Sequence, residues 1–96
     1  MYIAIFQSNP GTQKLRDENR PAHDAYWEEH IHRLRVAGPI LTDDGQGRLG
    51  QMLLIDAPDK ATAEKIVTED PFVKVGLFAS WSIQRYRVSV ENGKTL

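Results

Sequence analysis

The sequence predicts an α+β fold in which one four-stranded antiparallel sheet carries two helices on one of its faces. Three observations lead to this prediction. Apolar runs rich in β-branched and aromatic residues alternate with two amphipathic stretches, in the order strand, helix, strand, strand, helix, strand. The chain has 96 residues, enough for one domain, and its 41% hydrophobic and 26% charged residues are typical of a globular protein. We therefore expect a single domain over residues 1–96, with its core at about residues 2–88.

The first strand and the first helix are predicted from local patterns. Residues 2–7 form a continuous apolar run before a turn-forming segment, which indicates a central strand buried on both faces. After a polar connection over residues 12–18, a helix is expected at about residues 21–36, with Asn19 as its N-cap. Pro21 suits the first turn of a helix, where its missing amide hydrogen leaves no hydrogen bond unmade, and a glycine-proline pair ends the helix.

A hairpin is predicted next. Residues 39–42 and 49–56 have the composition of two short strands, and the acidic, glycine-rich segment 43–47 joins them. The glycines of this hairpin superficially match a phosphate-binding loop. They lie between two strands, and not between a strand and a helix, so we assign no phosphate to them.

The second helix and the last strand complete the pattern. Asp59 is a good N-cap for a short amphipathic helix over residues 61–69. The pair Asp70-Pro71 ends that helix, because the residue before a proline is disfavoured in the helical region, and an apolar link of about one helical turn follows. Residues 79–90 alternate between two faces and are predicted to form the last strand, while residues 91–96 are a tail.

This order of elements is that of the split β-α-β, or ferredoxin-like, arrangement, in which both helices cover the same face of the sheet. The strands are nevertheless apolar on both faces, since Tyr2, Ala4 and Phe6 alternate with Ile3 and Ile5. Such a sheet needs a second cover, and for a small chain the simplest cover is another copy of the same sheet. We therefore predict a homodimer packed sheet against sheet.

Charge and composition argue against several classes of partner. The formal net charge is -1 and no run of lysine or arginine occurs, so neither nucleic acid nor a membrane surface is an expected partner. The chain has no cysteine, and it shows neither a signal-peptide pattern nor a segment long enough to span a bilayer. We therefore expect a cytoplasmic protein.

Four motifs, in order along the chain, resemble the YCII-related (YciI-like) family. They are Arg20-Pro21-Ala22-His23 followed by Tyr26, then Ala37-Gly38-Pro39, then Gly50 with Met52-Leu53-Leu54, and finally Asp70-Pro71-Phe72-Val73 with Gly76-Leu77. The likeness extends from about residue 2 to residue 87. It implies the dimeric α+β barrel form of the ferredoxin-like fold, in agreement with the homodimer predicted from the sheet.

The resemblance also implies a pair of catalytic residues, the helix histidine and the aspartate of the Asp-Pro-Phe motif, which correspond to His23 and Asp70. Some relatives are lyase-like enzymes that remove a halide from a small cyclic substrate. An imidazole can take up a proton near neutral pH, and a carboxylate on its second nitrogen fixes the tautomer and stabilises the imidazolium. The plainer interpretation is that His23 is a packing residue and that Asp70 only caps the turn before Pro71.

Further residues are candidates for contact with a substrate. An apolar cavity for an aromatic or cyclic ligand could be walled by Tyr26, Trp27, Phe72 and Trp81. Aromatic residues at such spacings also serve as plain core, so both interpretations stay open. Arg20, near the start of the predicted helix, could bind a substrate anion or could simply be solvated.

We expect neither a metal site nor an organic cofactor. His30 and His32 point to different sides of a helix, and no third ligand accompanies His23 and His30. The favoured function is proton abstraction from a small organic molecule, with or without elimination, by His23 oriented by Asp70. A non-catalytic module that binds a small ligand is the alternative, and a cofactor-free oxygenase or isomerase is a third possibility from the analogy of architecture alone. The sequence does not name the substrate.

Overall fold

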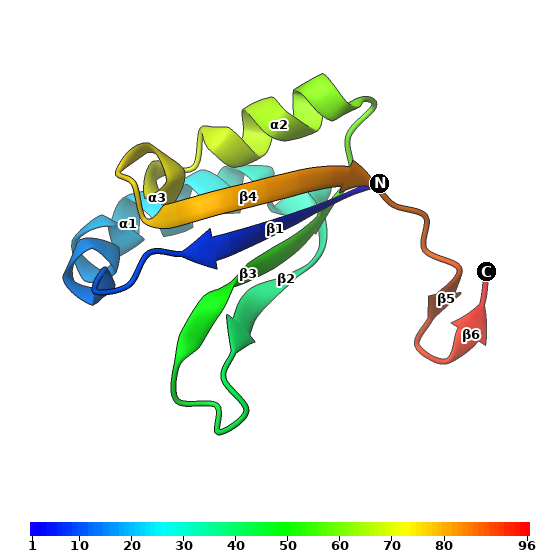
Figure 1. The fold of residues 1–96 in the computed structure, drawn as a ribbon. Coiled ribbons are helices and arrows are strands. Elements are labelled where there is room, and N and C mark those ends of the chain that lie inside the picture. The colour runs from blue at the N-terminus through cyan, green and yellow to red at the C-terminus, as the bar shows by residue number, and fades with distance from the viewer.

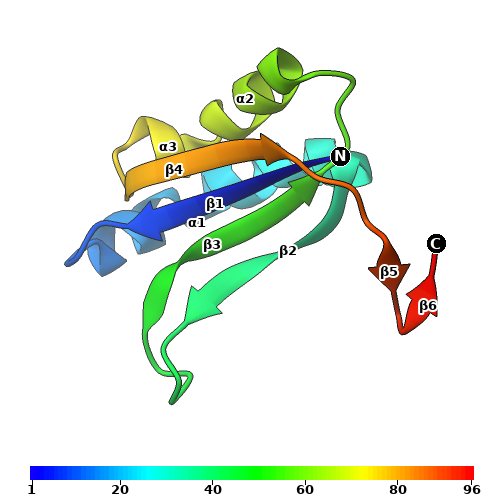
Figure 2. The same cartoon turned by 45° about the vertical axis from the view of Figure 1, so that its right-hand side comes forward.

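A computed structural model describes residues 1–96. It has one four-stranded sheet, three helices on one face of that sheet and a separate hairpin at the C-terminus (Figures 1 and 2). The elements are β1 (Tyr2–Ser8), α1 (Gln13–His30), a 3-10 turn (Ile31–Arg33), β2 (Leu34–Leu41), β3 (Arg48–Ile55), α2 (Lys60–Thr68), α3 (Pro71–Lys74), β4 (Phe78–Arg85), β5 (Val90–Glu91) and β6 (Lys94–Thr95). The predicted ferredoxin-like α+β class is confirmed.

The sheet has the strand order β2-β3-β1-β4, and all neighbouring strands are antiparallel. The predicted central position of β1 is confirmed, because Ile5 pairs with Met52 of β3 on one side and with Ser82 of β4 on the other. β2 and β4 are the edge strands. In both views the far end of the β2-β3 hairpin reaches past the helices.

The core lies between the sheet and the helices. Ala4 and Phe6 of β1 face the helices and are fully buried, whereas Ile5 between them faces away and keeps 41% of its surface exposed. The other large, fully buried apolar side chains are Ile55, Val67, Phe72 and Leu77. One face of the sheet is thus the core, and the opposite face is apolar and open.

The first helix does not start where the sequence predicted. α1 begins at Gln13 and continues through Pro21. The prediction of Asn19 as the N-cap is wrong, because Asn19 lies inside the helix and its side-chain amide donates to a backbone carbonyl one turn earlier. Pro21 removes one backbone hydrogen bond. Arg16 and Trp27, one on each side of the proline, are both buried, and this tertiary packing outweighs the local preference.

The end of α1 and the start of β2 also differ from the prediction. The helix ends at His30, and residues 34–36, predicted to be helical, belong to β2. β2 pairs with β3 from Leu34 opposite Ile55 to Leu41 opposite Arg48. These hydrogen bonds join segments that are distant in the sequence, so no local pattern reveals that the strand begins so early.

The second half of the chain follows the prediction more closely. Asp59 caps α2, and its carboxylate accepts a hydrogen bond from the backbone N–H of Thr62 at 2.8 Å. The predicted break at Asp70-Pro71 is confirmed, and the single turn after it is α3. None of the helices combines the length and the apolar character that a membrane span requires.

Beyond β4 the chain departs from the prediction again. The last strand of the sheet ends at Arg85, and the segment treated as a tail pairs β5 with β6. Asn92 and Gly93 both have positive φ values, as the tight turn of a two-residue hairpin requires. An ion pair between Arg35 and Glu91 links this hairpin to β2, although the hairpin stands apart from the sheet and the helices (Figure 1).

Substitution of Gly50 tests whether β3 approaches β1 as closely as the structure shows. A Cβ atom at Gly50 would lie 1.8 Å from the carbonyl oxygen of Phe6, so a larger residue must push the two central strands apart. We expect Gly50→Ala to lower the free energy of unfolding by at least about 2 kcal/mol, as measured by denaturant unfolding.

Gly38→Ala is the matched control, because a Cβ atom at Gly38, on the neighbouring strand β2, would meet no atom within 4 Å. This variant should change the free energy of unfolding by less than about 0.5 kcal/mol. Equal stability of the two variants would mean that β1 and β3 are not this close at Gly50.

Candidate functional site

Asp70 is a buried acidic residue around which the site is arranged. It is the N-cap of α3, and only 1% of its surface is exposed. Its Oδ1 accepts hydrogen bonds from the backbone N–H of Phe72 at 2.9 Å and from His23 Nδ1 at 2.8 Å. Its Oδ2 accepts a hydrogen bond from Trp27 Nε1 at 2.9 Å. A buried carboxylate is stable only when its oxygens are hydrogen-bonded, and these three donors meet that need.

His23 comes from the middle of α1 and borders a cavity on its other side. An ionised carboxylate only accepts hydrogen bonds, so in the neutral form of His23 the hydrogen lies on Nδ1, which faces Asp70, and the lone pair lies on Nε2. The His23 ring is stacked on the Phe72 ring, with centroids 3.8 Å apart and planes inclined by 11°. The hydrogen bond and the stacking together fix the orientation of the imidazole.

Tyr26, a predicted substrate-binding residue, does not line the cavity beside His23. Its O–H donates to the backbone carbonyl of Ile66 in α2. Burial, followed by the charges of Glu69 and Asp70, raises the pKa of Tyr26 to about 12. The phenol therefore stays protonated and serves as a fixed link between α1 and α2.

A cavity of about 260 Å³ opens between α1 and the β2-β3 hairpin. Its walls are formed by Arg16, Arg20, His23, Trp27, Leu34, Ala37, Gly38, Pro39, Arg48, Gln51, Leu53 and Phe72. Its volume suits a small molecule with one substituted ring. The predicted residues Arg20, His23, Trp27 and Phe72 thus meet at one cavity. Asp70 is hydrogen-bonded to three of them, to the side chains of His23 and Trp27 and to the backbone of Phe72.

Arg16 is the most deeply buried charged residue of the cavity. Only 4% of its surface is exposed, and its guanidinium carbon lies 5.3 Å from the centroid of the Phe72 ring. Burial, together with the neighbouring charges of Arg48 and Arg20, lowers the pKa of Arg16 from its usual value. The guanidinium nevertheless stays protonated at neutral pH, so a fixed positive charge lies inside the cavity.

Three polar residues of the cavity were not predicted from the sequence. Arg16 lies seven positions before His23 and therefore on the same face of a continuous helix, but this signal is lost when the helix is taken to start at Pro21. Arg48 and Gln51 come from β3, and only the pairing of the strands brings them beside α1. No local pattern in the sequence marks these two.

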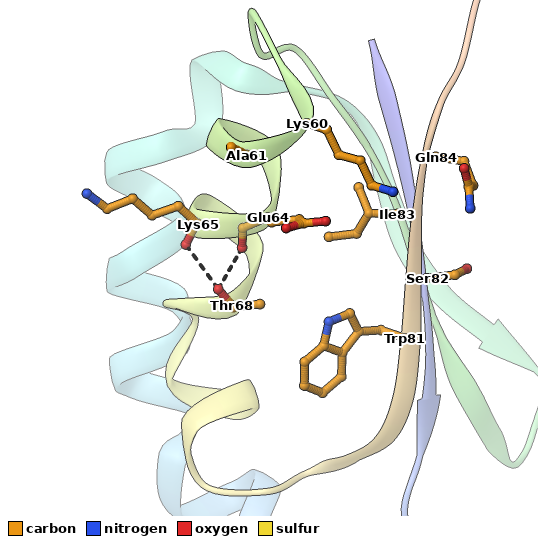
Figure 3. Close-up of a pocket in the computed structure, with 9 residues that line it drawn as sticks. All are labelled: Lys60, Ala61, Glu64, Lys65, Thr68, Trp81, Ser82, Ile83 and Gln84. Carbon is orange, nitrogen blue, oxygen red and sulfur yellow. Dashed lines mark hydrogen bonds between the residues drawn. The ribbon is translucent and has the colours of Figure 1, made fainter.

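Trp81 lies in a different depression. An open groove of about 660 Å³ runs between α2 and β4, where Trp81 and Ile83 point toward α2 and Lys60 reaches across from the helix (Figure 3). Most of the residues that line this groove are exposed, and it holds no buried pair of titratable groups. The structure therefore does not bring Trp81 to His23, and the candidate site remains the smaller cavity.

The histidines near the end of α1 do not join His23. His30 Nδ1 is hydrogen-bonded to the carbonyl of Tyr26 at 2.9 Å, and its ring stacks on the Tyr26 ring. The chain contains no group of three or more histidine, aspartate or glutamate side chains arranged to hold a metal ion.

The chain is similar to one family of proteins and to solved structures. The family model of the YCII-related domain matches residues 1–87. One similar solved structure is 5-chloro-2-hydroxyhydroquinone dehydrochlorinase (TftG) from Burkholderia phenoliruptrix AC1100, in complex with 2,5-dihydroxybenzoquinone. It has a TM-score of 0.79 and 30% sequence identity, over 90% of this chain and 92% of that chain. The structure of At3g17210 from Arabidopsis thaliana has a TM-score of 0.49 and 11% identity, over 95% of this chain and 96% of that one. None of the curated proteins matches the chain.

Replacement of Asp70 by asparagine tests the arrangement of its three donors. An amide has one acceptor oxygen and one NH₂ group, so at least one of the donors from Trp27 and Phe72 would face another donor in a buried position. We expect Asp70→Asn to lower the free energy of unfolding by about 1–3 kcal/mol. We also expect the neutral His23 ring to lose its preference for a proton on Nδ1, as measured by the NMR chemical shifts of its ring nitrogens.

Asp59→Asn is the matched control, because Asp59 is also a helix N-cap but is exposed and accepts from Thr62 alone. Asparagine is an equally good N-cap, so the free energy of unfolding should change by less than about 0.5 kcal/mol. An unchanged His23 tautomer in Asp70→Asn would show that the carboxylate does not control the imidazole.

Proposed function

The chain belongs to the YCII-related family, and from that premise we propose that it is a small-molecule enzyme in which His23 and Asp70 act as an acid-base pair. The proposed reaction is abstraction of a proton from a small cyclic or aromatic compound, followed by elimination of a leaving group. The substrate would occupy the cavity between α1 and the β2-β3 hairpin, against Trp27 and Phe72.

The unequal surroundings of the two His23 ring nitrogens carry this proposal. Nδ1 is bound to the buried carboxylate of Asp70 at 2.8 Å, while the ring borders the cavity and keeps Nε2 free to accept a proton. A histidine that only packed would not need an ionised partner in the core. Burial of a charged carboxylate carries a desolvation cost that its hydrogen bonds must offset, and we take a role in proton transfer as a better account of this pair than packing alone.

The proposed reaction conserves atoms and charge at each step. The reacting form of a hydroxylated ring is its keto tautomer, in which the carbon that carries the leaving group is tetrahedral. Nε2 of His23 takes a proton from this tautomer, and the electron pair of the broken bond forms a new π bond. The leaving group departs from the tetrahedral carbon as an anion with its own bonding pair. The Asp70 carboxylate stabilises the imidazolium that forms, and release of the proton to water restores the neutral ring.

The similarity to TftG supports the elimination step. That protein is a dehydrochlorinase of 5-chloro-2-hydroxyhydroquinone, which is a single substituted ring, and its structure holds 2,5-dihydroxybenzoquinone. Removal of hydrogen chloride from such a ring requires loss of a proton and departure of chloride, which are the two events proposed for this chain. We therefore propose small hydroxylated rings that carry a leaving group as its substrates.

We also propose that the chain forms a homodimer through the open face of the sheet. The apolar side chains on this face are Ile3, Ile5, Val36, Ile40, Met52 and Leu54. Of these, Val36 is 51% exposed and Ile5 is 41% exposed. A contiguous apolar surface on a small domain is typical of an interface, and the two-fold packing of identical sheets would cover it completely.

The acid-base pair is tested by turnover. The wild type would be incubated with 5-chloro-2-hydroxyhydroquinone and related chlorinated hydroxyaromatics, and chloride release would be measured. We expect His23→Gln to lower kcat/KM by a factor of about 10²–10⁴, because the amide cannot take the proton. Asp70→Asn should also lower kcat/KM, by a smaller factor, since the imidazole remains but is no longer held in one tautomer.

His30→Gln is the matched control, because His30 lies on the same helix but outside the cavity, and it should leave kcat/KM within a few-fold of the wild type. Full activity in His23→Gln would exclude the acid-base role. If the wild type binds these compounds but never releases chloride, and Asp70→Asn binds them equally well, the chain is a ligand-binding module instead.

The proposed dimer is tested by sedimentation. Ile5 lies at the centre of the open face, between β3 and β4, so a lysine there would place a charge in the apolar contact. We expect the wild type to sediment as a dimer and Ile5→Lys as a folded monomer. Ile31→Lys is the control, since Ile31 is 61% exposed but lies in the turn after α1, and it should remain a dimer. A monomeric wild type would contradict the proposal.

A further inference from the structure

We propose that the cavity beside His23 binds ring compounds that carry ionised oxygens, through the guanidinium groups of Arg16, Arg20 and Arg48. The oxygens belong to carboxylate or deprotonated hydroxyl groups of the ligand. The link to catalysis rests on the proposed function. The binding itself is argued from the charge of the cavity, from its unpartnered polar atoms and from the position of Phe72.

The charged side chains that line the cavity are all positive, apart from the titratable His23. Three of the residues that line it are arginines, and none is an aspartate or a glutamate. The ion pairs of the chain are Lys14 with Glu18, His23 with Asp70, and Arg35 with Glu91. No arginine of the cavity is therefore paired with a carboxylate. Guanidinium groups gathered in this way repel one another, and an anion relieves that repulsion while it accepts their N–H donors.

Buried polar atoms without a partner lie in the same region. The two such side-chain atoms are Gln51 Nε2 and Ser8 Oγ. Gln51 lines the cavity beside His23, and Ser8 lines an adjoining cavity of about 310 Å³ that shares Arg16 and Arg48 with it. An unsatisfied buried polar group costs stability, so such groups are rare in the absence of a functional reason. Both atoms thus belong to cavities that are lined by Arg16 and Arg48, and a polar ligand bound there could supply the hydrogen bonds that they lack.

Phe72 brings the positive charge and the proposed base to one ring-sized space. Its ring stacks on His23 with a centroid distance of 3.8 Å, and the Arg16 guanidinium carbon lies 5.3 Å from its centroid. His23 and Arg16 thus contact the same aromatic ring. A ligand with one ring can place an ionised oxygen at Arg16 while another of its atoms lies at His23 Nε2.

The test uses three ring compounds of similar shape and different charge: benzamide, benzoate and isophthalate. Binding to the whole chain would be measured by calorimetry and by tryptophan fluorescence, to which Trp27 in the cavity contributes, at low and at high salt. We expect affinity to rise in the order neutral, monoanion, dianion, and the difference to shrink at high salt, because salt screens the charges. Inorganic phosphate should bind more weakly than isophthalate, because it has no ring to place against Phe72.

Arg16→Met and Arg48→Gln should each weaken isophthalate binding by about tenfold or more, since each removes charge-assisted hydrogen bonds. Arg87→Gln is the matched control, because it loses the same charge from an exposed residue outside the cavity, and it should bind like the wild type. We also expect Arg16→Met to melt at the same temperature as the wild type or higher, because methionine keeps an apolar stem and removes an uncompensated buried charge. An arginine with a merely structural role would give a lower melting temperature and an unchanged affinity.

Equal affinity for benzamide and isophthalate would overturn the inference, and so would phosphate binding as tight as that of isophthalate. The outcome is separable from that of the proposed function. If His23→Gln binds isophthalate normally and no substrate is ever turned over, the anion site stands and the proposed enzyme fails. If turnover is lost in His23→Gln but is unaffected in Arg16→Met and Arg48→Gln, the enzyme stands and the anion site fails.

Discussion

One buried carboxylate, that of Asp70, joins the helical layer of this fold. Its donors come from two elements, α1 with His23 and Trp27, and α3 with the backbone N–H of Phe72. Because an unpaired charge in the core costs several kcal/mol, α1 cannot slide along the sheet or rotate without a penalty that few apolar contacts could offset. The hydrogen bond that fixes the position of the helix also fixes the tautomer of His23. Fold stability and the proposed chemistry therefore depend on the same atoms.

The sequence was sufficient to predict the secondary structure wherever neighbouring residues alone determine it. Asp59 caps α2 and Pro71 breaks the chain after it, since both effects act within a few residues. It was insufficient at Pro21, where a local preference for a helix start loses to the burial of Arg16 and Trp27 on either side. It also failed at the start of β2, which exists only because β3 pairs with it. Local propensity is a weak effect beside nonlocal packing.

The residues of the candidate site also fall into two groups, those that local sequence patterns predict and those that only the tertiary structure brings together. His23 and Trp27 lie one helical turn apart, so a helix of any starting point places them together. Arg16 could have been predicted only from a helix that runs uninterrupted through the proline. Arg48 and Gln51 could not have been predicted at all, since their place in the cavity is set by the register of β3 beside β2. The family resemblance thus points to the candidate acid-base pair, whereas nothing in the sequence marks the polar wall of the cavity.

The separation of charge in the site is itself a reason to regard it as functional. Asp70 and Arg16 are both buried and are close enough for their charges to interact, and pairing them directly would be the simplest way to stabilise both. Asp70 instead takes its hydrogen bonds from an imidazole, an indole and a backbone amide, while Arg16 is left over the Phe72 ring. The carboxylate of Asp70 thereby contacts His23, and the guanidinium of Arg16 lines the cavity. Such an arrangement leaves the charge of Arg16 without a carboxylate partner, and the anion that we propose for the cavity would supply one and thereby stabilise the fold.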